Sequence, residues 1–438
     1  MSGIRAERMS GRLADGTAWS AAVPASWNGV LVSDADLFDR PEDRGFDAWC
    51  LGAGMAIART SREVTQWCVG RAIDNRAEVH GAIERRFGRP ERVLVTGASL
   101  GGLVTRALME QGAGLADAGV AMNGGGAGTV GLWNIKLDAA FALDVLLAGD
   151  ADRAPGAVAG RLRDPAHIGA LVTRARQSAA GRARLVLAAA LARQPVWSDP
   201  ERPEPVPDDL RALADGMTST LDLALAPAIR AAVEAEAGGV FGWNTDVDYA
   251  ALVAGAGDRR AVVAQAYADA GLDPDDDVAA LDAAPRIAAD PAALAWAADN
   301  RIWSGQLSGP VVTMYAIGDP AAVPEEEAAY ARTVARAGRT ELLQQLFLRA
   351  AGHCRYTTGE QAVAVRAALD ALDGRTGHQS AAGRNRCADE IDEHLATEHG
   401  APLRPAAFFD FRPEEFPRPF DRFDARAVEE PVLSERRT

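Results

Sequence analysis

The sequence predicts an α/β fold in which a mostly parallel sheet is flanked by helices and interrupted by a large helical insertion. Three observations support this prediction. Short apolar stretches alternate with helical patterns over residues 1–126. An alanine-rich, amphipathic stretch then runs from about 132 to 301, and the alternation of strand and helix returns between 305 and 373. Alternating strands and helices favour parallel pairing, because parallel neighbours need a crossover connection, which is usually a helix.

The same changes in composition predict four segments. We expect a first part of the core at 1–126, a helical lid or cap at 127–304, a second part of the core at 305–373, and an extension at 374–438 packed on the core. The extension is polar and interrupted by prolines, which predicts extended chain. Its aromatic patch, Phe408 to Phe411, docks on the protein's own core or on a second subunit, so a homodimer stays open.

Each predicted core element is recognised by its hydrophobic period and the turn residues that bound it. Before the insertion, the predicted strands are 17–24, 27–32, 54–60, 92–96 and 119–122, and the predicted helices are 75–84 and 103–110. After it, the predicted strands are 310–316 and 343–348, and the predicted helices are 325–337 and 359–372.

Composition and charge exclude several classes of function. The formal net charge of −15 argues against a nucleic-acid partner, because phosphate binding needs clustered basic residues. The start of the chain is charged and no run of about 18 apolar residues follows, so we expect a cytoplasmic protein that is not bound to a membrane. The four cysteines lie far apart without a CxxC pair, which disfavours a zinc site, and we expect no metal.

The segment from Gly97 to Gly101 reads Gly-Ala-Ser-Leu-Gly, between a predicted strand and a predicted helix. This is a G-x-S-x-G nucleophile turn in the context that such a turn requires. Small residues must flank Ser99, because a turn sharp enough to lift a side chain above the sheet leaves no room for other Cβ atoms. The following helix offers the Leu100 N–H and a positive dipole end to a developing oxyanion.

Two other glycine-rich turns compete with this interpretation. The turn of short-chain dehydrogenases would place its third glycine at 103, which is Leu, and it would lie near the N-terminus. Those enzymes also need a Tyr-x-x-x-Lys pair, whereas Lys136 is the only lysine and Leu132 precedes it by four positions. A P-loop needs Gly-Lys-Ser/Thr, which is absent from the sequence. A purely structural glycine turn stays open.

A serine needs an imidazole to take its proton, and the imidazole needs a carboxylate to orient it. The required chain order is Ser, then Asp or Glu, then His. Of the six histidines, His353 alone follows the last predicted core strand, while Asp319 follows the strand before it. A capping or packing role for His353 is the alternative. Asp246 and Asp248 are weaker candidates for the acid, because they lie inside the insertion.

In these motifs and their order, the sequence resembles the α/β-hydrolase superfamily, in particular serine esterases and lipases with a large helical lid. The resemblance implies a sheet of about eight strands, a lid after the sixth strand, and ester, thioester, lactone or amide chemistry through an acyl-enzyme. It implies no cofactor. One feature departs from the family pattern, in which His-Gly follows the strand at 30–32 and completes the oxyanion hole. Here Ser33-Asp34-Ala35-Asp36 stands there, so the backbone of Asp34 or Ala35 is the expected donor, although two carboxylates would oppose an oxyanion.

These features predict a hydrolase acting on an ester, thioester or lactone of a hydrophobic small molecule. An acyltransferase, cyclase or dehydratase of small-molecule metabolism could use the same triad, and a non-catalytic binding protein on a hydrolase fold is a third alternative. The tryptophans of the insertion, above all Trp133, Trp243 and Trp303, are candidate contacts for the apolar acyl group.

Overall fold

The computed structural model contains a nine-stranded sheet with the order β1-β2-β4-β3-β5-β6-β7-β8-β9. It describes residues 5–35, 43–61, 65–112, 114–149, 151–299, 301–375, 379–399, 404–418, 421, 422 and 424. The strands from β3 to β8 pair in parallel, while β1, β2 and β9 pair antiparallel at the two edges. The predicted α/β class with a mostly parallel sheet is therefore confirmed.

The strands are β1 Ala6–Arg12, β2 Ala18–Pro24, β3 Val30–Asp34, β4 Ala56–Thr60, β5 Arg92–Ala98, β6 Ala118–Met122, β7 Val311–Gly318, β8 Leu343–Ala351 and β9 Phe408–Phe409. The helices that belong to the sheet region are α1 Asp43–Gly52, α2 Val69–Phe87, α3 Leu100–Gln111, α15 Glu325–Arg336, α16 Thr358–Leu372 and α17 Ala381–His399. A short 3-10 helix, Thr340–Leu342, precedes β8. Strand β1 and helix α1 were not predicted from the sequence.

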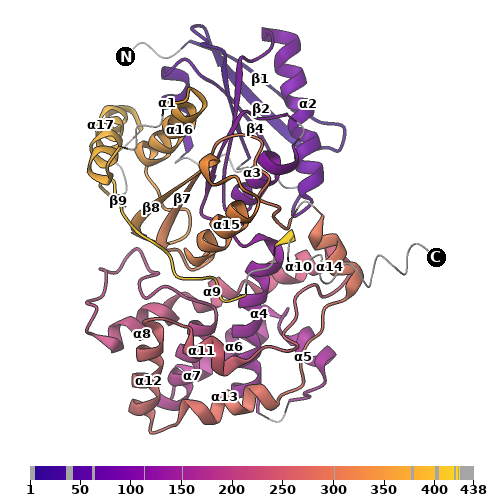
Figure 1. Ribbon diagram of the computed structural model, residues 1–438, viewed down its shortest axis with the longest axis vertical. Coiled ribbons are helices and arrows are strands. Elements are labelled where there is room, and N and C mark those ends of the chain that lie inside the picture. The colour runs from indigo at the N-terminus through magenta and orange to yellow at the C-terminus, as the bar shows by residue number, and fades with distance from the viewer. Residues whose placement is uncertain are drawn as a thin grey trace, which may run out of the picture.

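The sheet is covered by helices on both faces, as Figure 1 shows. Helices α1, α16 and α17 bury one face in a core that includes Val32, Leu94 and Met314 from the strands. Helices α2, α3 and α15 cover the other face, where Val95 and Val311 belong to the core. Both faces are apolar because parallel strands are buried on both sides. The carboxyl ends of β5, β7 and β8 consequently meet at one edge, where side chains can project from the sheet.

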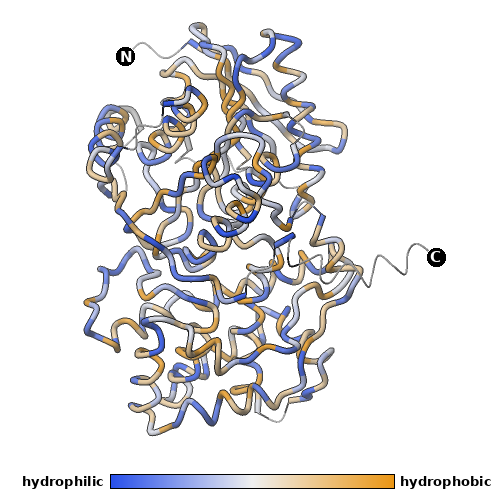
Figure 2. The backbone as a smooth tube through the Cα atoms, viewed as in Figure 1, coloured by the Kyte–Doolittle hydropathy of each residue, from blue (hydrophilic) through white to orange (hydrophobic). Residues whose placement is uncertain are grey.

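A helical segment connects β6 to β7 and lies below the sheet in the view of Figure 1. Its helices are α4 Gly128–Leu147, α5 Pro155–Arg161, α6 Pro165–Ala175, α7 Ala179–Leu191, α8 Leu210–Ser219, α9 Leu221–Leu225, α10 Pro227–Ala237, α11 Tyr249–Ala254, α12 Arg259–Ala270, α13 Pro274–Ala283 and α14 Pro291–Ala298. Helix α4 is almost entirely buried, and α7 packs beside it in a hydrophobic core separate from those of the sheet. Figure 2 shows hydrophobic residues in both regions. Within the described residues, no helix is long and apolar enough to cross a membrane.

The expectation of an entirely extended C-terminal segment was wrong, because residues 381–399 form helix α17. Ala388 and Ile391 pack into the core beside α16, with Cys387 and Leu395 at its edge. This spacing follows one face of a helix, but the charged residues between these positions hide it. Beyond α17, Phe408 pairs with Leu348 of β8, so the aromatic patch docks on the protein's own sheet.

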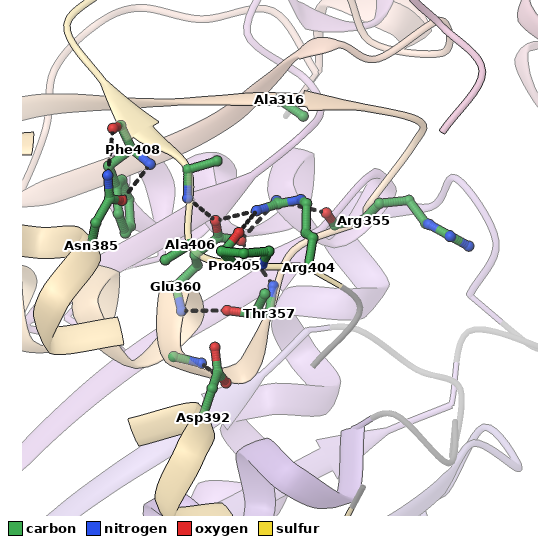
Figure 3. Close-up of polar contacts among 12 residues, drawn as sticks. Ala316, Arg355, Thr357, Glu360, Asn385, Asp392, Arg404, Pro405, Ala406 and Phe408 are labelled. Carbon is green, nitrogen blue, oxygen red and sulfur yellow. Dashed lines mark hydrogen bonds and ion pairs between the residues drawn. The ribbon is translucent and has the colours of Figure 1, made fainter. Parts of the chain in front are cut away.

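The extension also holds the start of α16, as Figure 3 shows. The Glu360 carboxylate is fully buried and forms an ion pair with Arg404, at 2.7 Å from Oε1 to Nη1. The Thr357 and Ala407 backbone N–H groups also donate to this carboxylate. Arg404 Nη2 donates at 3.0 Å to the carbonyl oxygen of Arg355. The loop that carries His353 is thereby connected to the extension.

Candidate active site

The turn between β5 and α3 holds Ser99 in a strained backbone conformation, with φ 54° and ψ −120°. L-residues rarely adopt this region, and such strain persists only where the surroundings enforce it. The Ser99 N–H donates to the Met122 carbonyl of β6 at 3.0 Å. A Cβ on Gly97 would lie 2.6 Å from the Gly101 backbone, and a Cβ on Gly124 would overlap the Ser99 carbonyl oxygen. The glycines therefore allow three backbone segments to meet beneath the serine.

Three residues predicted from the sequence are brought together above the sheet. Ser99 Oγ lies 2.9 Å from His353 Nε2, and His353 Nδ1 lies 2.7 Å from Asp319 Oδ2. Asp319 directly follows β7 and His353 follows β8, so the carboxyl ends of neighbouring strands deliver the acid and the base. Asp319 is fully buried. This arrangement can move a proton from the hydroxyl to the imidazole while the carboxylate stabilises the charged ring.

The Asp319 carboxylate is fixed by donors from two elements. The N–H groups of Ala321 and Ala322 donate to Oδ1 at 2.8 and 3.1 Å. The side-chain amide of Asn123, which follows β6, donates to Oδ2, while its own oxygen accepts from the Ala316 N–H. Sequence analysis missed Asn123. The available signal was a polar residue directly after a strand, at the same sheet edge as Ser99.

Burial and charge act in opposite directions on His353. Burial lowers the pKa of the imidazole, but the Asp319 carboxylate and the Cys354 side chain outweigh it, so the pKa lies well above 6.5. Cys354 Sγ lies 3.4 Å from Nε2. Since only the neutral ring can accept a proton, this environment moves the working range of the base toward alkaline pH.

The three predicted oxyanion donors lie in different surroundings. Leu100 is the first residue of α3, where an N–H has no intrahelical acceptor, so its role stays a prediction. The Ala35 N–H donates to the Thr96 carbonyl and is not available in this arrangement, which corrects the expectation for that residue. Asp34 is the last residue of β3, between β4 and β5. Its carboxylate pairs with Arg59 at 2.9 Å, which offsets its charge. Asp36 lies outside the described residues.

Ser99 and His353 line a cavity of about 460 Å³ whose wall is mostly apolar. The sheet region contributes Leu100, Leu103, Asn123 and Gly124, and the helical segment contributes Leu132, Trp133, Lys136, Leu223 and Ile229. Leu223 and Ile229 are exposed, whereas Trp133 and Lys136 are buried, so the cavity runs from a partly apolar rim to a buried inner end. Its size suits a small organic ligand.

Of the three tryptophans expected to contact substrate, only Trp133 lines this cavity. Trp303 is buried beneath α15, where its ring meets Tyr330 and its N–H donates to the Gly125 carbonyl. Trp243 packs under the Arg418 guanidinium of the extension. Those two expectations were wrong because both rings fill contacts between segments distant in sequence. Trp67 lines the cavity and was missed.

The weaker acid candidates are placed elsewhere. The Asp248 side chain accepts from the Ala251 N–H and caps α11. Asp246 lies in the preceding turn, with φ 60°. Neither residue lines the cavity that contains Ser99. Asp319 is therefore the acid that the fold brings to the histidine.

The chain is similar in sequence to a known amidase. The chain is 29% identical over 398 residues to an o-phthalyl amidase from Xanthobacter agilis, which covers 83% of this chain and 86% of the relative. No family model matches the chain.

Among solved structures, the chain is similar to an esterase from Aspergillus oryzae, with 11% identity, 84% and 80% of the two chains covered, and a TM-score of 0.44. It is also similar to brefeldin A esterase, described as a bacterial homologue of human hormone-sensitive lipase, with 14% identity, 91% and 79% covered, and a TM-score of 0.35.

The turn after β5 indicates which class of protein the chain is similar to. A G-x-S-x-G turn between a buried strand and a helix is the nucleophile elbow of α/β-hydrolases, and here it stands at the edge of a mostly parallel sheet. The sheet and this turn are similar to those of α/β-hydrolases, and the sequence relative of the chain is an amidase.

Proposed function

We propose that this enzyme hydrolyses amide or ester bonds of small molecules with an apolar acyl group, through a Ser99–His353–Asp319 triad and an acyl-enzyme. The observation that carries the proposal is the hydrogen-bonded chain from Ser99 Oγ through His353 to Asp319, at a cavity with an apolar wall. Among the bonds that the family resemblance implies, the amidase relative favours amides.

In the first half of the reaction, Ser99 Oγ attacks the acyl carbonyl carbon and His353 Nε2 takes the hydroxyl proton. The Leu100 N–H, at the start of α3, donates to the resulting oxyanion. The imidazolium then returns the proton to the departing amine or alcohol, and the acyl group remains on Ser99. Water, with His353 as its base, releases the acid and restores the serine.

A fluorophosphonate probe tests this proposal directly, because it phosphonylates an activated serine. Intact-mass spectrometry should show one adduct on the wild-type protein and none on Ser99→Ala or His353→Ala. The control is Ser304→Ala, which removes a hydroxyl that donates to Glu110 and should leave the adduct intact. An adduct that persists in Ser99→Ala would contradict the assignment. So would the absence of an adduct on folded wild-type protein whose cavity admits the probe.

A further inference from the structure

The only lysine of the chain lies in the wall of the reaction cavity. Lys136 projects from α4, one turn after Trp133, and only 6% of it is exposed. Its ammonium group donates to the Ala224 carbonyl at the end of α9 and lies 5.7 Å from the centre of the Trp133 ring. An ammonium has three N–H donors. Within the described residues, the hydrogen bonds of Lys136 use one of them.

Among the described residues, no carboxylate lies within ion-pairing distance of Lys136 Nζ, and the charges of Glu326 and Asp319 act on it from farther away. Burial lowers the pKa of the Lys136 ammonium, and the nearby charge of Arg230 lowers this pKa further. The negative charges of Glu326 and Asp319 act in the opposite direction, and the resulting pKa is about 8. A buried cation of this kind is costly unless an anion accompanies it. A ligand carboxylate would supply that anion and the missing acceptors.

We propose that Lys136 binds a carboxylate carried by the acyl group of the substrate, beside the carbonyl that Ser99 attacks. This inference rests on the proposed function and names its substrate class: amides of aromatic acids that carry a second carboxylate, such as 2-carboxybenzoyl amides. The buried Trp133 ring offers a flat apolar contact for the aromatic ring. The relative's name, o-phthalyl amidase, describes an acyl group of this chemistry.

The cavity also favours one negative charge over two. Asp222 lies at its exposed rim, so a dianion such as a phosphate ester would meet a carboxylate as well as the lysine. Leu223 and Ile229 surround the same rim with apolar surface, which suits the amine or alcohol part of the substrate. The acidic end of the substrate therefore belongs at the buried end of the cavity.

The test compares two amides of the same chromogenic amine, one with a 2-carboxybenzoyl and one with a benzoyl group. Wild-type enzyme should prefer the 2-carboxybenzoyl amide in kcat/KM. Lys136→Met should lower kcat/KM for that substrate by about 100-fold and for the benzoyl amide far less, because removing one partner of a buried charge pair is costly. Lys136→Arg, which keeps the charge, should recover part of the preference. Arg211→Met is the control, since Arg211 is exposed on α8 and pairs with Asp269.

Direct binding separates this inference from the proposed function. In Ser99→Ala protein, the monoanion 2-carbamoylbenzoate should bind more tightly than neutral benzamide in calorimetry, and adding Lys136→Met should abolish the difference. If the wild-type enzyme hydrolyses neither chromogenic amide but 2-carbamoylbenzoate binds in this lysine-dependent way, the proposed function fails and the carboxylate site stands. A wild-type enzyme that prefers the benzoyl amide would overturn the carboxylate site. An equal loss for both substrates in folded Lys136→Met would do the same, because it would assign the lysine to holding α9.

Discussion

The sheet and the helical segment contribute different kinds of residue to one cavity. Ser99, Asn123 and His353 come from strand ends, and each has a polar group in a hydrogen-bonded chain. The helical segment supplies apolar side chains and one buried charge, that of Lys136. A sheet edge fixes backbone positions tightly, which suits proton transfer, whereas packed helices can vary the shape of a wall. If the proposed function holds, the sheet provides the reacting groups and the helical segment provides the selectivity.

This separation makes a measurable distinction. Variants at the strand ends should lower the turnover of every substrate by a similar factor, because they alter steps that all substrates share. Variants of the helical segment, such as Lys136→Met, should change the ratio between substrates. A strand-end variant that changes selectivity alone would contradict this separation of roles.

The largest effect is expected for Asp319→Asn. The amide cannot stabilise the imidazolium and favours the wrong tautomer of His353, so kcat should fall by about 10⁴-fold for all substrates. The protein should remain folded, because the N–H groups of Ala321 and Ala322 can still donate to the remaining side-chain oxygen. Steady-state kinetics with a 2-carboxybenzoyl and a benzoyl amide would measure both the loss and its uniformity.

The pH dependence of the rate gives a second measure of the role of Asp319. The pKa of His353 is raised, so kcat/KM of the wild-type enzyme should fall as the pH drops through a midpoint above 6.5. In Asp319→Asn the carboxylate that raises this pKa is gone while the burial that lowers it remains, so the midpoint should move to lower pH. An unmoved midpoint would mean that another group titrates.

A smaller effect is expected when the positioning residue Asn123 is replaced. Asn123→Ala removes a hydrogen bond to the Asp319 carboxylate and should lower kcat by about 10-fold with little change in KM. A lost hydrogen bond to a charged group costs about 1.5–3 kcal/mol, and the loss should lie at the low end because other donors to Asp319 remain. Asn123→Gly is the matched control, because Asn123 has a φ of 41° that glycine adopts without strain. Recovery of kcat in the glycine variant would show that strain, not the hydrogen bond, caused the loss.

Local patterns were sufficient to predict the fold class and the residues that stand where strands end. Ser99, Asp319 and His353 each follow a strand with a clear apolar run, and their order in the chain matches their order across the sheet. Long-range contacts were not predictable in this way. The Asn123 amide meets a carboxylate 196 positions away, and no local pattern encodes that distance.

The same limit explains the errors in the helical segment and the extension. A tryptophan looks the same in the sequence whether it faces a cavity, as Trp133 of α4 does, or fills a contact between segments, as Trp303 does in the connection between α14 and β7. Which face is free depends on how helices pack, and packing is set by many contacts at once. Helix α17 was missed for a related reason, since its apolar face is narrow and covers a surface formed by α1 and α16.

The smallest effect on activity is expected in the extension, which lies outside both compared regions. Arg404→Met leaves the buried Glu360 carboxylate without its cation and frees the Arg355 carbonyl in the loop after His353. The thermal midpoint should fall by a few degrees, because a buried charge loses its partner. If the extension positions only the loop that carries His353, kcat should fall by about two- to threefold for both amides, whichever acyl group they carry, since loops tolerate small displacements at modest cost.

Arg375→Met is the control, because it removes an exposed ion pair with Asp370 and should change neither the thermal midpoint nor the kinetics. A change in the ratio between the two amides would instead assign the extension to the selectivity of the helical segment, which it reaches through the ion pair between Arg418 and Asp138.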